Sequence, residues 1–435
     1  MRWRQIDHIL LATALLLLLL SLLWWPLRMV YADSAYMSWR LMQWEQMDAG
    51  RWRWLSYITQ IFPWLAVKAQ APTAAVLAIY SLALQLPHTV VSFLAWKKGA
   101  SGTALASVLL SAVWMQSAWF IPVSEMHLAA AVLLLWNLFP RHGWLTALAW
   151  FTHPGIGPIL LVMIVLPGFS SGRWRALYWL LPAIVLKQWF GDAYEQGFAA
   201  GLLECNTLSE SYVFAYLRRT WSHPEWLLSL AFLPLSWLFL KRREALLHLL
   251  ACGILLVVLA LIYRKGDSDV WMQKNLLPMA MAMALPVLAW LDRKTDTKSP
   301  DKVALAVLPL FPIMAFSLWQ GQQDALQRLK HLEVYMESCS GSGKWLIKED
   351  ETLHRALGAV WALPYESLLL SSWKTPESQK TLLPFQTAPP PEALRPDLFI
   401  GAPFAPPVSV RLLNQRYFQL PLHKYQFTDS GKILP

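Results

Sequence analysis

Long uncharged runs alternate with short charged segments along the chain as far as residue 323. The runs cover residues 9–27, 71–96, 99–124, 143–172, 245–263, 275–291 and 303–323. Each run approaches or exceeds the roughly 17–25 residues that a helix needs to cross the hydrocarbon core of a bilayer. The pattern therefore predicts an all-α polytopic membrane protein.

The first run also fits a cleaved signal peptide, because small residues end the stretch "RMVYA" just before Asp33. Its apolar part is longer than the roughly 7–15 residues of a signal core, however, and Arg28 stands where a cleavage region is normally neutral. A retained first helix is the favoured interpretation.

The charge balance follows the topology of such a protein. Of the 435 residues only 15% are charged, and the net charge is +10. The basic residues of several short loops can all be placed on one side of a membrane: Arg2, Arg4, Lys97, Lys98, Arg141, Arg173, Arg175, Lys241, Arg242, Arg243, Arg293, Lys294 and Lys298. That is the positive-inside pattern, so the basic character predicts a cytoplasmic N-terminus and requires no nucleic-acid partner.

Residues 143–172 do not fit a single span, because Arg173 and Arg175 would then lie on the wrong side. The segment contains two prolines and two glycines between His153 and Pro158, which a continuous helix does not accommodate. We therefore predict two half-length helices, 143–152 and 156–169, that meet at a turn bordering a cavity. With this correction the chain has about eleven transmembrane segments, two of them half-length.

Residues 323–435 read differently from the rest. The pattern predicts helices over 323–338 and 350–371, a strand over 344–349, and irregular chain through the proline-rich stretch 384–407. We expect a transmembrane domain over 1–322 and a small α/β or irregular extracytoplasmic domain over 323–435, in a protein of a bacterial inner membrane. A disulfide between Cys205 and Cys339, which both map outside, stays open.

Charged residues are scarce inside the apolar runs, which offer mainly His88, His153 and His248. Ion-coupled transporters need ionisable groups along an intramembrane pathway, so this scarcity disfavours them. The charges gather instead where the runs meet the outer side, as at Asp33 and Glu125. A site at that boundary suits a reaction between a lipid-borne substrate and a partner outside.

Four stretches resemble the GT-C superfamily of integral membrane glycosyltransferases. They are "ADSAYMSWRLMQWEQMDAGRW" after the first run, "PVSEMHLAAAVLLLWNLF" at 122–139, the broken segment 143–175, and "WMQKNLLPMAMAMALPVLAWL" at 271–291. Each motif is degenerate, and the order and sidedness of the four carry the resemblance. The chain departs from the family at His153, where Arg or Lys is common, and at Lys274-Asn275, where Arg-Tyr is common.

The resemblance implies transfer of a sugar from a polyprenyl-phosphate carrier to a glycan, lipid or protein acceptor, with inversion and with no required cofactor. A carboxylate then takes the proton of the acceptor hydroxyl, and cationic groups bind the leaving phosphate. By resemblance Asp33 is the base and Glu125 a second site residue. Their ordinary alternatives are a helix N-cap for Asp33 and a dipole-favoured charge at a helix start for Glu125.

The candidate phosphate ligands are Lys274, Arg264, Arg218 and His153, and for Lys274 the alternative is a lysine that snorkels to the interface. Asp267 and Asp269 form a D-x-D pair, which binds a divalent metal in other glycosyltransferases but also arises by chance. A second function stays open: a lipid-glycan transporter or assembly partner that keeps the fold without the chemistry.

Overall fold

The computed structural model describes most of the two ends of the chain and parts of its middle. The described residues are 3–48, 55–114, 119–120, 122, 125–153, 156–165, 173–189, 232–237, 240, 242–262, 281, 283, 284, 287, 288, 292 and 310–428. Within them the fold is mostly helical with a small strand-containing part, as predicted. The number of transmembrane segments stays a prediction.

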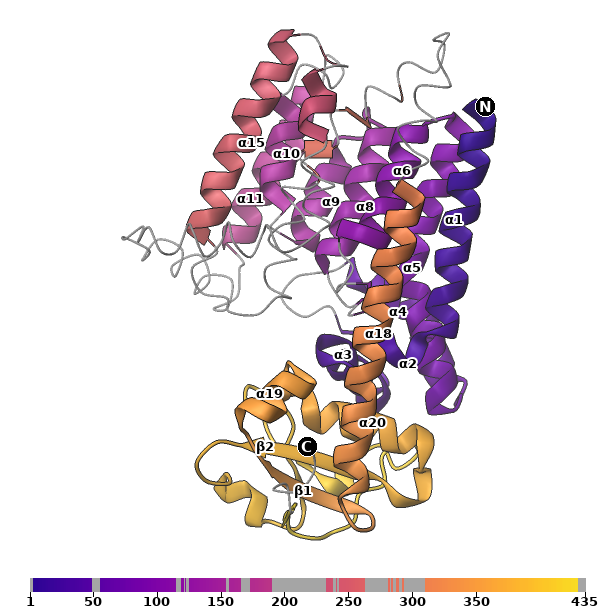
Figure 1. The fold of residues 1–435 in the computed structure, drawn as a ribbon. Helices are drawn as coiled ribbons and strands as arrows, with labels where there is room; N and C mark the ends of the chain where they lie inside the picture. The colour runs from indigo at the N-terminus through magenta and orange to yellow at the C-terminus, as the bar shows by residue number, and fades with distance from the viewer. Residues whose placement is uncertain are drawn as a thin grey trace.

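The N-terminal helices form one side of a bundle (Figure 1). They are α1 (Trp3–Leu23), α2 (Trp25–Met29), α5 (Thr73–Lys98), α6 (Ser101–Leu109), a π-helical turn (Leu110–Trp114) and α8 (Glu125–Leu138). Pro26 starts α2 after a break at Trp24, because proline fits the first turn of a helix. Gly99 ends α5 in the left-handed conformation, and the N–H of Ala100 bonds to the carbonyl of Ala95.

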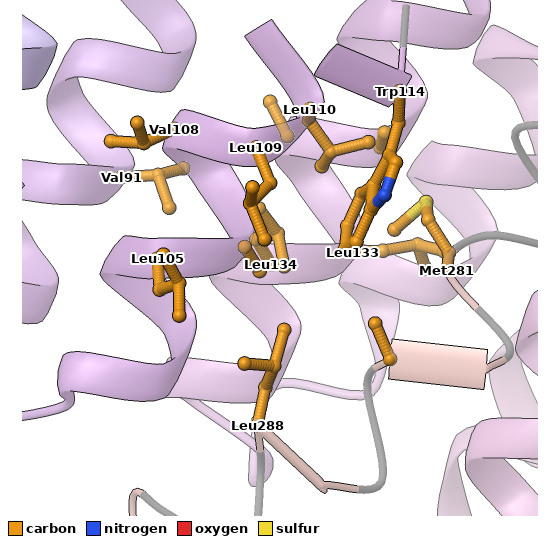
Figure 2. Packing of buried hydrophobic residues seen from close by; sticks show 14 of the residues in the cluster. Val91, Leu105, Val108, Leu109, Leu110, Trp114, Leu133, Leu134, Met281 and Leu288 are labelled. Atoms are coloured by element: carbon orange, nitrogen blue, oxygen red, sulfur yellow. The ribbon is translucent and has the colours of Figure 1, made fainter. Parts of the chain in front are cut away.

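The core of the bundle is apolar and closely packed. Figure 2 shows Val108 of α6 beside Val91 of α5, and Leu109 of α6 beside Leu134 of α8. Every residue of α6 is buried, and many of them are small, which lets the neighbouring helices approach closely.

The broken segment is confirmed. Helix α9 (Trp144–Thr152) ends at His153, whose backbone is extended, and α10 (Gly157–Val165) begins four residues later. A short 3-10 helix (Arg173–Ala176) leads into α11 (Leu177–Trp189), and α15 (Arg242–Ile262) lies at the far edge of the bundle from α1 (Figure 1). The position of the turn relative to a membrane is not tested.

Among the described residues, two helical stretches are long and apolar enough to cross a bilayer, by length and composition alone. They are Gln5–Leu23 and Thr73–Lys98, and two shorter apolar helical stretches are Ser101–Trp114 and Glu125–Leu138.

Helix α18 (Leu310–Glu337) joins the bundle to the C-terminal part (Figure 1). We placed the domain boundary between residues 322 and 323, and α18 runs through this point without interruption. Buried Gly321 lies within the helix at this point, and glutamines follow it. Glutamine is a good helix former, so the polar stretch does not end the helix.

The C-terminal part is a small α/β unit, as predicted. Its elements are β1 (Gly343–Lys348), α19 (Glu351–Leu357), α20 (Leu363–Lys374), β2 (Lys380–Phe385), β3 (Leu398–Phe399), β4 (Val408–Ser409) and β5 (Gln426–Phe427). Strand β1 pairs in parallel with both β2 and β5, and Trp345 lies opposite Leu382. Asp350 caps α19 by accepting the N–H of Leu353 at 2.7 Å.

This unit packs directly on α3 (Ala32–Trp44), the helix that follows α2, while α4 (Ser56–Lys68) and α5 contribute to the same core. Trp39 lies 4.9 Å from the ring of Tyr365 and 5.7 Å from that of Phe399. Across the contact, the Asn414 N–H donates to Oε1 of Gln43 at 2.9 Å, and the Asn414 side-chain amide donates to the carbonyl of Met42 at 2.8 Å. Helix α3 is therefore enclosed between the bundle and the C-terminal unit (Figure 1), rather than lying open at an interface.

Candidate functional site

The chain leaves the first helix through a strained turn that the C-terminal unit holds in place. Ala32 begins α3 with a φ of 43°, a left-handed conformation that costs about 1–2 kcal/mol for a residue with a Cβ. Its N–H donates to Oε1 of Glu366, on α20, at 2.7 Å. A carboxylate more than 300 residues away in sequence thus caps the start of α3, where the helix dipole favours negative charge.

Arg328 of α18 neutralises this buried carboxylate. Its Nη2 pairs with Glu366, its Nε donates to the carbonyl of Leu357 at 2.9 Å, and its Nη1 donates to that of Val30 at 3.2 Å. The guanidinium also lies 3.6 Å from the ring centre of Tyr31. Burial raises the pKa of Glu366, and Arg328 and the Ala32 N–H oppose that rise.

A glycine completes the contact. Gly358 has a φ of +66°, and a Cβ at this position would lie 2.9 Å from the hydroxyl oxygen of Tyr31. Tyr31, Arg328 and Glu366 together fix the backbone directly before Asp33, and we call this set the α3 clamp.

Asp33 lies in the first turn of α3 and is half-buried. Met37 follows it by one helical turn, so the two side chains leave the same face of α3. Met37 lines a hollow between α3, α4, α5 and α8. Asp33 therefore stands at the end of the helix face that borders this hollow.

The hollow is small, with a cavity volume of about 30 Å³, and it is partly open to solvent. Its lining residues are Met37, Ser56, Thr59, Gln60, Tyr80, Leu84, Pro122, Glu125, His127 and Leu128. Hydroxyl, amide and carboxyl groups thus face a space bordered by apolar side chains, which is the usual composition of a small-molecule site. We call it the α3–α8 hollow.

One acidic residue lines this space, and a second is bonded to a lining residue. Glu125 lines the hollow from the start of α8, and the charges of both Glu125 and Asp48 act on Tyr80. Asp48 is held by Gln60, whose amide oxygen accepts from the Asp48 N–H and whose amide nitrogen donates to its carbonyl, both at 2.7 Å. Asp48 also pairs with Arg40, so it belongs closer to the candidate site than its place in a polar loop suggested.

The other acid of this stretch has a structural partner. Glu45 pairs with Lys68 at 3.2 Å, and its second oxygen accepts from the Asn414 amide at 3.1 Å. It serves the contact between α3, α4 and the C-terminal unit.

The structure brings only some of the predicted site residues to the elements that border the hollow. Asp33 and Glu125 belong to elements that meet at the α3–α8 hollow. His153 ends α9 and is not among the residues that line this hollow. Lys274, Arg264 and Arg218 lie outside the described residues, as do Asp267 and Asp269.

Two features of the site were missed by our sequence reasoning. Arg28 is fully buried at the end of α2, 4.1 Å from the ring centre of Trp119. His88 and His127 stack with ring centroids 4.0 Å apart, and Nε2 of His88 lies 3.0 Å from the carbonyl oxygen of His127. An arginine at the end of a long apolar run was the available signal for Arg28.

Within the part of the chain that the structure describes, no three His, Cys, Asp or Glu side chains come together as a metal site. Cys339 is a buried, free thiol whose Sγ lies 3.4 Å from the carbonyl oxygen of Tyr335, and Cys205 lies outside the described residues.

Comparison with known proteins leaves the family open: no protein-family model, curated protein or solved structure matches the chain.

Proposed function

We propose that the chain is a membrane glycosyltransferase that moves a sugar from a polyprenyl-phosphate carrier to an extracytoplasmic glycan, lipid or protein acceptor. One observation carries the proposal. Glu125 lines a hollow whose wall also includes Met37, one helical turn from Asp33. The two carboxylates that the GT-C resemblance selects thus belong to elements that border one partly enclosed space.

In the proposed reaction Asp33 takes the proton of the acceptor hydroxyl as that oxygen attacks the anomeric carbon. The new glycosidic bond forms while the bond from the anomeric carbon to the phosphate oxygen breaks, and the lipid phosphate leaves with the bonding electrons. Glu125 and Tyr80 orient the sugar through hydrogen bonds. No metal is required, because the leaving group is a single phosphate ester that cationic side chains stabilise.

The outer surface of the bundle supports a membrane location. Large apolar side chains are more than half exposed on several helices, among them Leu16 on α1 (53%), Val185 on α11 (59%) and Ile254 on α15 (57%). Apolar surface on this scale is costly in water and suits a lipid environment. In the proposal the chain has about eleven spans, with its N-terminus cytoplasmic and its C-terminal unit extracytoplasmic.

The decisive experiment is the Asp33→Asn variant of the full chain, expressed in a deletion strain whose glycans and lipids are profiled. The deletion strain should lack one sugar on an envelope glycan or accumulate the lipid-linked donor. Removing a positioned general base lowers transfer by about 10²–10⁴-fold, so Asp33→Asn should not restore the profile. Glu125→Gln should lower transfer less.

Glu45→Gln is the matched control, because Glu45 lies at the other end of α3 and has structural partners. It should restore the profile fully. Full restoration by Asp33→Asn at normal protein levels would show that Asp33 is not the base. An unchanged glycan and lipid profile in the deletion strain itself would end the glycosyltransferase proposal and favour the non-catalytic assembly partner.

A further inference from the structure

Among the described residues, no side chain or backbone group forms a hydrogen bond with the buried guanidinium of Arg28. Its side chain is 0% exposed, and its Nε, Nη1 and Nη2 atoms all lack a hydrogen-bond partner. Its single polar interaction among the described residues is with the face of the Trp119 ring. A guanidinium remains protonated at neutral pH, so among the described residues this buried positive charge is compensated only by the Trp119 ring.

Such a charge is costly to the protein. The penalty for burying an ion is large, and a single contact with an aromatic ring offsets only part of it. Proteins normally pair such a group or leave it in water. An anion bound beside Arg28 would supply the missing compensation.

A second polar atom in the same region also lacks a partner. His127 is buried, and its Nε2 makes no hydrogen bond. The charge of Arg28 acts on the His127 ring, so the two side chains are electrostatic neighbours. His127 also lines the α3–α8 hollow with Glu125, which connects the pair to the candidate site.

The surroundings are aromatic. Trp119 packs against Trp24 at 5.8 Å and against Phe120 at 4.9 Å, and Trp24 also stacks on Phe120. A guanidinium fork and an imidazole N–H can meet several oxygens of a tetrahedral anion at once. The apolar lining suits an amphiphile whose chain remains in an apolar medium.

We propose that Arg28 and His127 form a buried oxyanion site that binds the phosphate of a phosphate ester. The site deepens the proposed function and rests on it for one point, that the ester is the lipid-linked donor or its leaving lipid phosphate. The free protein leaves Arg28 without compensation, and the bound phosphate removes that cost.

Binding is tested on the purified full chain by thermal stabilisation, with three probes. The probes are a short-chain polyprenyl monophosphate, the matching prenol without phosphate, and inorganic phosphate. The polyprenyl monophosphate should raise the Tm and the prenol should not. Arg28→Met keeps the length of the side chain and should weaken binding of the phosphate lipid by about 10- to 100-fold, the loss of a charge-assisted contact.

Arg173→Met is the matched control. Arg173 is also a buried arginine over a tryptophan, with its guanidinium carbon 4.9 Å from the Trp136 ring centre, but its Nη2 donates to Oδ1 of Asn137 at 2.8 Å. Arg173→Met should leave the affinity for the phosphate lipid unchanged. Arg28→Lys keeps the charge without the fork and should bind with intermediate affinity, which provides a test if Arg28→Met does not fold.

Equal binding of the phosphate lipid by Arg28→Met and the wild type would overturn the site, as would equal stabilisation by the prenol or no stabilisation by any probe. Inorganic phosphate that stabilises as well as the lipid, with the same dependence on Arg28, would support the oxyanion site but overturn its assignment to a lipid ester. Binding needs no turnover, so Asp33→Asn should bind normally. Full transfer by Asp33→Asn would show that Asp33 is not the base, and it would not affect the assignment of the oxyanion site.

Discussion

Two buried arginines contact the short segment that leaves the first helix, and their surroundings are opposite. Arg28 lies within the segment and has no hydrogen-bond partner for any of its three nitrogens. Arg328 reaches the segment from α18, with its side chain 12% exposed, and uses all three nitrogens on Val30, Leu357 and Glu366. The protein thus satisfies the donors of Arg328, whereas those of Arg28 have no hydrogen-bond partner among the described residues.

This difference separates a structural role from a binding role. A cation whose donors are all used by the protein stabilises the folded state and has no donor left for a ligand. A cation whose donors are unused destabilises the empty protein and gains most when a ligand arrives. The stability of variants at these arginines therefore distinguishes the two roles without reference to turnover.

The largest effect should follow from Arg328→Met. The substitution leaves the Glu366 carboxylate fully buried without its cation, and breaking a buried pair in this way costs about 3–5 kcal/mol. The Tm of the purified protein should fall, and protease should cut the α2–α3 connection more readily, because the clamp holds that backbone. A Tm equal to that of the wild type would show that the α3 clamp does not stabilise the fold.

Glu366→Gln should cost less, about 2–3 kcal/mol. The amide oxygen still accepts the Ala32 N–H, and Arg328 keeps two backbone carbonyls as partners. The same Tm measurement compares the two variants directly. If Glu366→Gln lowered the Tm more than Arg328→Met, the unpaired arginine would be costlier to the fold than the unpaired carboxylate. That result would contradict the prediction.

Arg28→Met should have the opposite sign. Because no hydrogen bond is lost and a buried charge is removed, the unliganded protein should become more stable by about 1–2 kcal/mol. Arg173→Met loses the bond to Asn137 and should lower the Tm. A fall in Tm for Arg28→Met as large as that for Arg173→Met would mean that Arg28 is held by the protein after all.

Much of the local structure was predictable from the sequence, because its causes are local. The prolines and glycines after His153 end α9, and Gly99 ends α5. The small α/β unit was legible from its alternating apolar and polar residues. The continuity of α18 was not, because a polar stretch inside a helix resembles a boundary when its packing partners are unknown.

The candidate site was predictable only in part, since its geometry depends on distant contacts. No local pattern connects Ala32 with Glu366 or Trp39 with Tyr365. Tyr36 and Trp39 of α3 pack against Tyr365 of the C-terminal unit, a contact that the sequence does not reveal. The isolation of Arg28 was likewise invisible, because a sequence shows which donors exist and not which are used.

The smallest expected effect concerns Lys344, a buried cation whose hydrogen bonding is intermediate between that of Arg28 and that of Arg328. It is 1% exposed and donates to the carbonyls of Pro396 and Leu398 at 2.7 and 2.8 Å, so its described hydrogen bonds are to neutral acceptors. Burial lowers the pKa of Lys344 from 10.5 to about 8, and the charge of Asp397 opposes that shift.

Above the lowered pKa of Lys344 the folded state releases the proton while the unfolded state keeps it, so stability should rise with pH between about 8 and 10.5. Between pH 7 and pH 8.5 the gain should be about 1 kcal/mol, measured as a Tm difference that Lys344→Met removes. A Tm that falls over this range by the same amount in both proteins would show that the two carbonyls hold Lys344 in its charged form.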